Sequence, residues 1–318
     1  MEDVFSYAPF VSIIMNCRDG QAYLREALDS IYAQSYTDWE IIFWDNLSTD
    51  ASAAIAKSYN TKLRYFKGEQ SLTLGQARNL AIARVKGRYL AFLDCDDKWL
   101  PRKLEKQVEL LEARKDIDFV YSNYFRLIMP ETDRLILGLR GRQPEGDVFG
   151  RFLCDYPVNL QTVMLRMDAV NRLRQEFDAN FEVSEEYDFF MRLLFKSKAL
   201  YINEPLAVYR LHQNMSSQRL LHKYPVEMED TLNKLKKMDV SVTQEFAPQI
   251  KYYEAKLGYW RAKADMERDA PESARIHLSP YKFISLKFFI LFLFTYLPPV
   301  IWKQLHRYKL QGKFRWLS

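Results

Sequence analysis

Short apolar runs alternate with stretches of helical periodicity through the first 125 residues. Five runs have the length of buried strands: residues 11–15, 40–44, 63–66, 89–93 and 119–123. After the first run, Leu24, Ala27, Leu28 and Ile31 follow the i, i+3, i+4, i+7 spacing of an amphipathic helix. Further helices are expected over 50–59 and 75–85, and Pro101 is placed to open another. This alternation predicts an α/β fold with a doubly wound, mostly parallel sheet.

In such a sheet, ligands bind at the carboxyl ends of the strands. The loops to examine are therefore those after Met15, Trp44 and Leu93. No G-x-G-x-x-G follows a strand and no G-x-x-x-x-G-K-[ST] occurs, so dinucleotide oxidoreductases and P-loop enzymes are not supported.

The loop after Leu93 concentrates negative charge. It reads Asp94-Cys95-Asp96-Asp97, three carboxylates in four residues. It could be a polar turn that caps the next helix. Two carboxylates spaced i, i+2 can also converge on one hard cation, and like charges so close together favour a bound cation such as Mg²⁺ or Mn²⁺.

Three other polar segments are candidates with a structural alternative. Asp45-Asn46 opens a segment that could be an Asx turn or could face a ligand at the sheet edge. The run 184–188, SEEYD, reads as a Ser N-cap followed by acids that suit the helix dipole. In 209–212, YRLH, the histidine could be a ligand or a packed residue, and Arg210 could pair with phosphate or with a structural acid.

Taken in order, these segments resemble a family 2 glycosyltransferase of the GT-A fold. The resemblance covers roughly residues 9–218 and is carried by VSIIMNCRDG, YLREALDSIYAQSYTDWEIIFWDNLSTD, GQARNLAIARVKGRYLAFLDCDDKWLPRKL, SEEYDFFMRL and YRLHQNMSS. It implies an inverting transfer of a sugar from a nucleotide-diphospho-sugar to an acceptor hydroxyl. It further implies that Glu186 is the general base and that Mn²⁺ or Mg²⁺ binds Asp94, Asp96 and His212. The donor would contact Asn16, Asp45, Asn46, Arg78 and Asp94.

The chain departs from the family pattern at three places. Glu186 stands where the family usually has Asp, Asn46 replaces a second acid, and the first loop reads Asn16-Cys17-Arg18. None of these changes removes an essential group, but they leave the donor sugar and the rate undetermined.

The positive charge of the chain lies at its end. The formal net charge is +5, but residues 275–318 carry eight Lys and Arg and no Asp or Glu, which leaves −3 for the rest. Residues 288–297, FFILFLFTYL, carry no charge and are too few to span a bilayer. This pattern predicts a segment in the membrane interface with Trp302, Tyr308 and Trp316 at headgroup level. The alternative is a buried helix packed on the domain, and the apolar content argues against a nucleic-acid partner.

These observations predict three segments: a GT-A catalytic domain over 1–225, a helical flanking segment over 226–274 and a membrane-associating tail over 275–318. The catalytic domain would hold a nucleotide-sugar half, about 9–125, and an acceptor half, about 126–218. Three cysteines without a CxxC pair fit a reducing compartment, and no secretory signal is visible. The expected place is the cytoplasmic face of the cell membrane, with a lipid-linked glycan as acceptor.

Two other functions share parts of this pattern. A nucleotidyltransferase would use the same pocket, but its Gly-rich basic loop is absent. A catalytically weak or inactive nucleotide-sugar binding module would bind donor without turnover.

Overall fold

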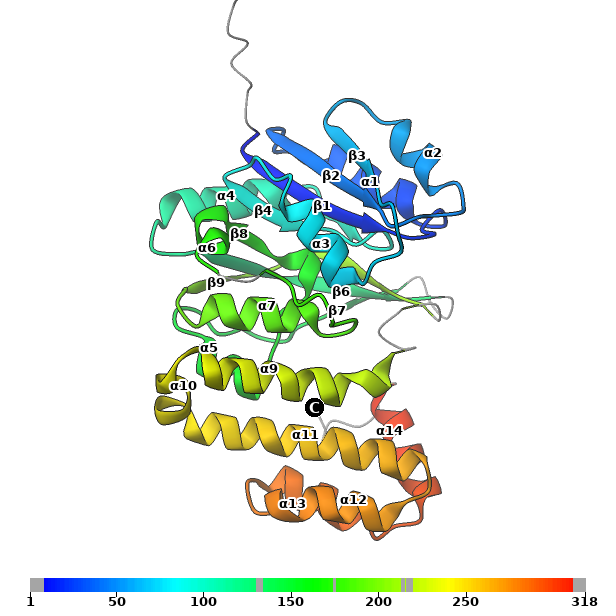
Figure 1. Ribbon diagram of the computed structural model, residues 1–318, viewed down its shortest axis with the longest axis vertical. Helices are drawn as coiled ribbons and strands as arrows, with labels where there is room; N and C mark the ends of the chain where they lie inside the picture. Colours follow the sequence, from blue (N-terminus) through cyan, green and yellow to red (C-terminus); the bar gives the residue numbers. More distant parts are fainter. Residues whose placement is uncertain (1–8, 130–133, 174–175, 213–214, 216–219, 311–318) are drawn as a thin grey trace, which may run out of the picture. The chain divides into compact units, whose positions relative to one another are not determined.

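The computed structural model describes residues 9–129, 134–173, 176–212, 215 and 220–310. These residues form two compact units (Figure 1). Unit 1 comprises Met1–Phe152 and Tyr156–Arg219, and unit 2 comprises Leu153–Asp155 and Leu220–Ser318.

Unit 1 is built on a sheet of nine strands among its described residues. The strands are β1 (Val11–Cys17), β2 (Trp39–Asp45), β3 (Leu63–Lys67), β4 (Tyr89–Phe92), β5 (Lys98–Trp99), β6 (Phe119–Ile128), β7 (Leu135–Leu137), β8 (Met164–Arg166) and β9 (Ala199–Leu211). Their order is β3-β2-β1-β4-β8-β6-β9-β5, with β7 paired to β6. The longest ladders, β1–β2 and β6–β9, are parallel, whereas β5, β7 and β8 pair antiparallel. The predicted α/β fold with a mostly parallel sheet is confirmed.

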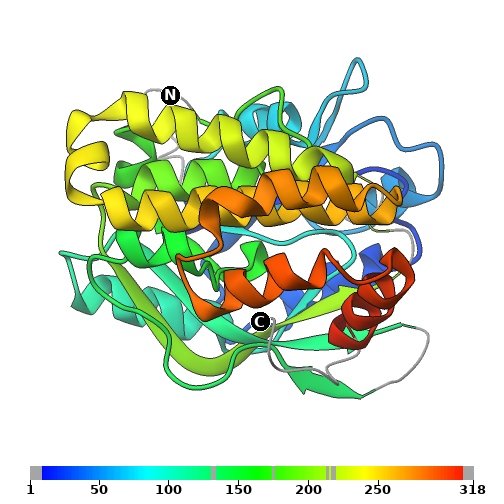
Figure 2. The same ribbon diagram turned by 90° about the horizontal axis from the view of Figure 1, so that it is seen from below.

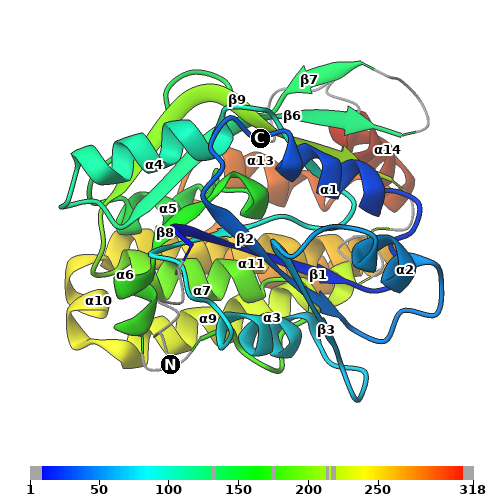
Figure 3. The same ribbon diagram turned by 90° about the horizontal axis from the view of Figure 1, so that it is seen from above.

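Helices cover both faces of this sheet. They are α1 (Leu24–Tyr32), α2 (Ser52–Lys57), α3 (Leu74–Ile82), α4 (Lys103–Ala113), α5 (Phe149–Cys154), α6 (Met167–Asn171) and α7 (Glu185–Leu194). Alternate residues of β1 point to opposite faces, so Ile13 and Met15 pack in one core with the predicted apolar stripe of α1 and with α4. Figure 3 shows α1 and α4 on one side of β1 and β2, with α3 and α7 on the other.

Two helix starts bear on the predictions. Helix α4 begins at Lys103, so Pro101 lies in the preceding turn and not in the first turn of the helix as expected. Helix α3 begins with a capping box in which Thr73 and Gln76 exchange side-chain and backbone hydrogen bonds. This cap fixes the start of the helix that carries Arg78.

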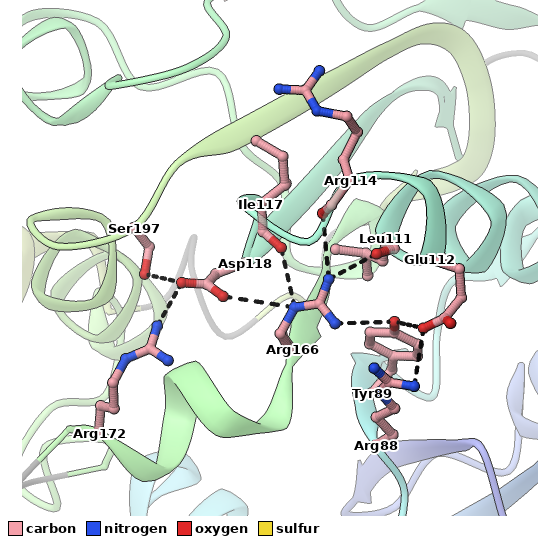
Figure 4. A network of polar contacts seen from close by, with 10 residues as sticks. All are labelled: Arg88, Tyr89, Leu111, Glu112, Arg114, Ile117, Asp118, Arg166, Arg172 and Ser197. Atoms are coloured by element: carbon pink, nitrogen blue, oxygen red, sulfur yellow. Dashed lines mark hydrogen bonds and ion pairs between the residues drawn. The ribbon is translucent and has the colours of Figure 1, made fainter.

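A buried arginine anchors β8 between β4 and β6 (Figure 4). The Arg166 guanidinium donates to the backbone carbonyl oxygens of Leu111 and Ile117 at 2.7 and 3.2 Å and to the Tyr89 hydroxyl at 3.2 Å. Around it, Asp118 accepts hydrogen bonds from Arg172 and Ser197. The network ties the short antiparallel strand to its neighbours at the amino end of β4.

Unit 2 is helical. Its helices are α9 (Tyr224–Met238), α10 (Val240–Glu245), α11 (Ala247–Glu267), α12 (Pro271–Leu278), α13 (Leu286–Phe294) and α14 (Pro299–Leu310). The long α11 packs against α9 and α12 (Figure 2). No helix among the described residues combines the length and apolarity needed to cross a membrane.

The structure corrects one expectation about the tail. Trp302 is 1% exposed and belongs to the core of unit 2, where Phe288 and Leu291 are also buried. It is therefore not available at headgroup level. Trp316 and the side chain of Tyr308 lie outside what the structure describes.

Candidate functional site

The three loops singled out in the sequence meet at one edge of the sheet. In β1 and β2, Cys17 lies opposite Asp45, and in β1 and β4, Ile14 lies opposite Phe92. Because these strands are parallel, the residues that follow them emerge side by side. The carboxyl edge of unit 1 thus brings together Asn16, Asp45, Asn46 and the loop 94–97.

The 94–97 loop presents two of its acids and buries the third. The side chains of Asp94 and Asp96 are 36% and 33% exposed, whereas Asp97 is 1% exposed. One Asp96 carboxylate oxygen, Oδ2, lies 3.0 Å from His212 Nε2, which follows β9. Asp97 accepts the backbone N–H of Arg210 at 2.7 Å, so β9 holds the loop in place.

Desolvation and like charge raise the pKa values of two acids in this loop, Asp94 and Asp97. The pKa of Asp94 lies above its ordinary value because it is desolvated and because Asp96 carries the same charge, although Arg78 opposes the shift. The pKa of Asp97 is raised well above its usual range by burial, with Asp96 and Asp94 adding to it. The ionised forms of Asp94 and Asp97 are therefore disfavoured in the absence of a cation.

This donor set fits a hard divalent cation. Asp94 and Asp96 supply exposed carboxylate oxygens, and His212 supplies a ring nitrogen beside them. No three His, Cys, Asp or Glu side chains within the described ranges are gathered closely enough to enclose a metal by themselves. Mg²⁺ and Mn²⁺ sites of nucleotide enzymes typically use one or two carboxylates and leave positions for substrate phosphates.

Arg78 connects this loop to α7. Its guanidinium is 2% exposed, lies 3.1 Å from Asp94 Oδ1 and forms a second, shorter ion pair with Glu185. Its other face lies 5.5 Å from the ring centroid of Phe177. The structure thus places Arg78 inside an ion network beneath the edge, where it orients the acid at the strand end.

The first turn of α7 carries two adjacent glutamates in different surroundings. Glu185 is buried against Arg78, whereas Glu186 is partly exposed and no described group hydrogen-bonds its carboxylate. The pKa of Glu186 is raised to about 8, chiefly by desolvation and further by Glu185 and Asp94, while Arg78 lowers it. The direction of this shift is the one expected for a base at the start of this helix.

The residues expected to contact the donor differ in what they already bind. Asp45 accepts the Tyr65 hydroxyl at 2.5 Å and the Ser48 backbone N–H at 2.8 Å. Asn46 exchanges two hydrogen bonds with the backbone of Leu72, at 2.8 and 3.2 Å. The Asp45–Ser48 contact is a local turn of the kind that the structural alternative predicted, whereas the Asn46–Leu72 contacts were not predicted.

Asn16 has no such partners. Its side chain is 9% exposed, and no described group hydrogen-bonds either its amide nitrogen or its amide oxygen. An unsatisfied buried amide costs free energy unless a ligand or water completes it. Of the three residues, Asn16 is thus the one whose side chain has unused hydrogen-bonding capacity.

Of the two partners considered for Arg210, phosphate or a structural acid, the structure shows an acid. Arg210 is 3% exposed, lies 2.5 Å from Glu26 and donates to the backbone oxygen of Asp96 at 2.6 Å. Its guanidinium also lies 4.3 Å from the ring centroid of Tyr23. Arg210 therefore stabilises the 94–97 loop through the backbone of Asp96.

Sequence reasoning missed two groups at this edge. Glu185 looks equivalent to Glu186 in the sequence, and only its burial shows that it pairs with Arg78. Cys17 and Cys95 both pack onto Gly20. A Cβ added at position 20 would lie 2.8 Å from each of the two Sγ atoms. The single glycine of the first loop was the available signal.

Comparison with known proteins gives consistent matches. The model of "Glycosyl transferase family 2" matches residues 12–165. A putative teichuronic acid biosynthesis glycosyltransferase, TuaG of Bacillus subtilis, is 30% identical over 67% of this chain and 83% of its own length. WfaP of Escherichia coli, a UDP-Glc:alpha-D-GlcNAc-diphosphoundecaprenol beta-1,3-glucosyltransferase, is 32% identical over 64% of this chain and 77% of its own length.

Two solved structures share the fold. S. aureus TarS in complex with UDP-GlcNAc superposes with a TM-score of 0.56 at 14% identity, covering 96% of this chain and 93% of that one. The mannosyltransferase PcManGT from Pyrobaculum calidifontis, in complex with GDP-Man and Mn²⁺, gives 0.60 at 18% identity, covering 95% and 85%. At these identities the likeness concerns the fold.

Proposed function

The chain belongs to glycosyl transferase family 2 and is a glycosyltransferase, and we propose that it moves a sugar from a nucleotide-diphospho-sugar to an acceptor hydroxyl with inversion. One observation carries the proposal. At a single sheet edge, the partly exposed Asp94 and Asp96 carboxylates lie beside His212, and Arg78 joins Asp94 to Glu185, the neighbour of Glu186 in the first turn of α7. Arg78 acts electrostatically on both Asp94, a proposed metal ligand, and Glu186, the proposed base.

Departure of a nucleoside diphosphate leaves negative charge on phosphate oxygens. Asp94, Asp96 and His212 would hold Mn²⁺ or Mg²⁺, which when bound supplies Lewis-acid stabilisation of that charge. Asp45 and Asn46 shape the nucleoside end of the site, and the unpartnered Asn16 amide would donate to or accept from the donor.

Glu186 would take the proton from the acceptor hydroxyl. Alcohols are weak nucleophiles and need a base within hydrogen-bond reach as the new bond forms. A carboxylate whose pKa is raised to about 8 holds a proton more strongly than an ordinary glutamate, which makes it the better base near neutral pH. Its free oxygens leave room for the acceptor.

The names of two relatives suggest the acceptor. TuaG is named for teichuronic acid biosynthesis and WfaP for transfer to a diphosphoundecaprenol-linked sugar. We therefore propose a lipid-linked glycan acceptor in surface polysaccharide biosynthesis, reached by peripheral contact with the cytoplasmic face of the membrane.

The test is release of nucleoside diphosphate from a panel of nucleotide sugars with Mn²⁺, Mg²⁺ or EDTA, with a lipid-linked acceptor mixture present. Asp96→Ala and Glu186→Gln are compared with Glu109→Gln, an exposed acid on α4. Metal-dependent turnover of one donor, abolished by the first two changes and kept by the third, supports the proposal. Donor binding without turnover would instead indicate a binding module, and no binding of any donor would overturn the site assignment.

A further inference from the structure

Helix α13 buries one face and exposes another, and both faces are apolar. Phe288 and Leu291 are 2% and 1% exposed in the core of unit 2. Leu286, Phe289 and Leu293 are 67%, 36% and 46% exposed. The last three follow i, i+3, i+7 spacing, so they share one side of the helix, opposite the packed one. The packed face agrees with the alternative of a buried helix, and the exposed face is the one that an interfacial helix would present.

The exposed stripe continues beyond the helix. Phe283, 81% exposed, precedes α13 and stacks on Phe289 with ring centroids 6.2 Å apart. Tyr296 follows the helix and is 62% exposed. We call the set Phe283, Leu286, Phe289, Leu293 and Tyr296 the α13 face. Contiguous exposed apolar side chains of this kind mark an interaction surface.

Positive charge borders the α13 face. The Lys282 ammonium lies 5.2 Å from the ring centroid of Phe283 and 5.1 Å from that of Phe292. The Arg275 guanidinium lies 4.8 Å from the ring centroid of Tyr296. Residues 275–318 contain no Asp or Glu. A partner for this surface must therefore accept apolar side chains and present negative charge.

We propose that the α13 face docks on the surface of an anionic lipid bilayer. Phe283, Leu286, Phe289 and Leu293 would enter the interfacial zone, with Lys282 at the anionic headgroups. The nine residues of α13 are too few to cross the hydrocarbon core, which sets the helix in the plane of the membrane. A second copy of the chain fits less well, because it would bring two acid-free basic tails together.

The membrane docking proposed here rests on the proposed function in one respect: the bilayer surface is where a lipid-linked acceptor would be met. Binding to vesicles needs neither donor nor metal, so it can be measured without turnover. An enzyme that binds vesicles but transfers no sugar would contradict the proposed function alone. An enzyme that transfers sugar but ignores vesicles would contradict this inference alone.

The experiment is co-sedimentation of the full chain with vesicles of phosphatidylcholine alone or mixed with phosphatidylglycerol. The test variant is Phe289→Ser/Leu293→Ser. Its matched control is Val226→Ser/Val240→Ser, since these valines are 59% and 68% exposed elsewhere in unit 2. Lys282→Glu probes the charge. We expect wild type and control to bind the mixed vesicles, with the test variant weakened roughly tenfold or more and Lys282→Glu by less.

Circular dichroism and thermal unfolding show whether the test variant keeps its fold, and Leu286→Ser is a milder second variant for the same measurement. Equal binding by wild type and the test variants would overturn the inference. So would a wild-type dimer in light scattering that becomes monomeric in the test variant and binds no vesicles, because the α13 face would then be a subunit interface.

Discussion

Arg166 lies at the amino end of β4 and Arg78 at its carboxyl end, and both guanidinium groups are buried in unit 1. They serve different partners. Arg166 donates chiefly to neutral groups, the carbonyl oxygens of Leu111 and Ile117 and the Tyr89 hydroxyl (Figure 4). Arg78 faces two carboxylates, Glu185 and Asp94, and a third acid, Glu186, lies close enough to raise its pKa.

At the amino end of β4 the polar groups are paired and stabilise the fold, whereas the acids at its carboxyl end are proposed to bind metal and substrate. At the amino end each nitrogen of the Arg166 guanidinium has an acceptor, and the short strand β8 is tied in place. At the carboxyl end the acids outnumber the cations, and the pKa values of Asp94, Asp97 and Glu186 are all raised. Active sites commonly keep such charge at a cost in stability. Four changes test this contrast.

The largest expected effect is on activity at the carboxyl end. Asp96→Asn removes a proposed metal ligand, and we expect kcat/KM for sugar transfer to fall on the order of 1,000-fold. The melting temperature should stay equal or rise, because one of the crowded charges is gone. Nucleoside diphosphate release and thermal unfolding measure the two quantities. An active Asp96→Asn enzyme would mean that the loop is only a polar turn.

The second change compares the arginines directly. Arg78→Met and Arg166→Met should each lower the free energy of unfolding by ~3 kcal/mol, since each leaves buried polar groups unpaired. Adding Glu185→Leu to Arg78→Met removes the stranded acid and should restore part of the loss. No single acid substitution should restore Arg166→Met, because its main partners are backbone carbonyls. Urea unfolding of these three variants and of Arg166→Met/Asp118→Leu measures this, since Asp118 is the acid 3.7 Å from Arg166, and equal rescue at both ends would contradict the comparison.

The third change concerns the proposed base. Glu186→Gln keeps the shape of the side chain but cannot accept the proton, so we expect kcat to fall by roughly 100-fold or more. Donor affinity should change little, and isothermal titration with the nucleotide sugar checks this. Glu185→Gln is the neighbouring control; it should mainly reduce stability, because Glu185 is buried against Arg78. A fully active Glu186→Gln enzyme would place the base elsewhere.

The smallest expected effect is on the pH dependence of stability in EDTA. The folded-state pKa of Glu186, about 8, lies above the ordinary 4.5, so the folded state binds the proton more tightly than the unfolded state. Its contribution to stability is therefore present below pH 4.5 and is lost as pH rises toward about 8. Glu186→Gln has no proton to lose. Relative to wild type it should gain stability through that window, by less than the loss expected from Arg78→Met, because the Glu186 side chain is partly exposed to solvent; urea unfolding at several pH values measures this.

Periodicity predicted most of the fold because apolar runs mark the central strands of this sheet. Each of the five predicted strands is present, although its first or last residue differs from the predicted one. Strand β8 was missed because three residues give no pattern, and β9 because Asn203, Glu204 and Pro205 interrupt it. Both strands are defined by pairing with strands that are distant in the sequence, and a local pattern does not reveal such pairing.

For the site, motif order predicted which segments meet but not how each side chain is used. His212 and Asp96 lie together as expected. The resemblance gave Glu186 a role, but the sequence could not show that Glu185 is buried against Arg78, since adjacent helical residues differ only in the direction they face. Nor could it show that Trp302 is buried, since aromatic residues suit a core as well as a membrane interface.

The packing of Cys17 and Cys95 onto Gly20 has a consequence for protein engineering. Neither sulfur leaves room for a methyl group at position 20, so that position and the two cysteines form one unit of sequence variation. A library that varies Gly20 alone should return few well-folded members other than glycine, because both sulfurs would have to move. A library that also allows alanine at 17 and 95 opens the position. The first loop, residues 16–20, can then be redesigned without changing Asp94 or Asp96.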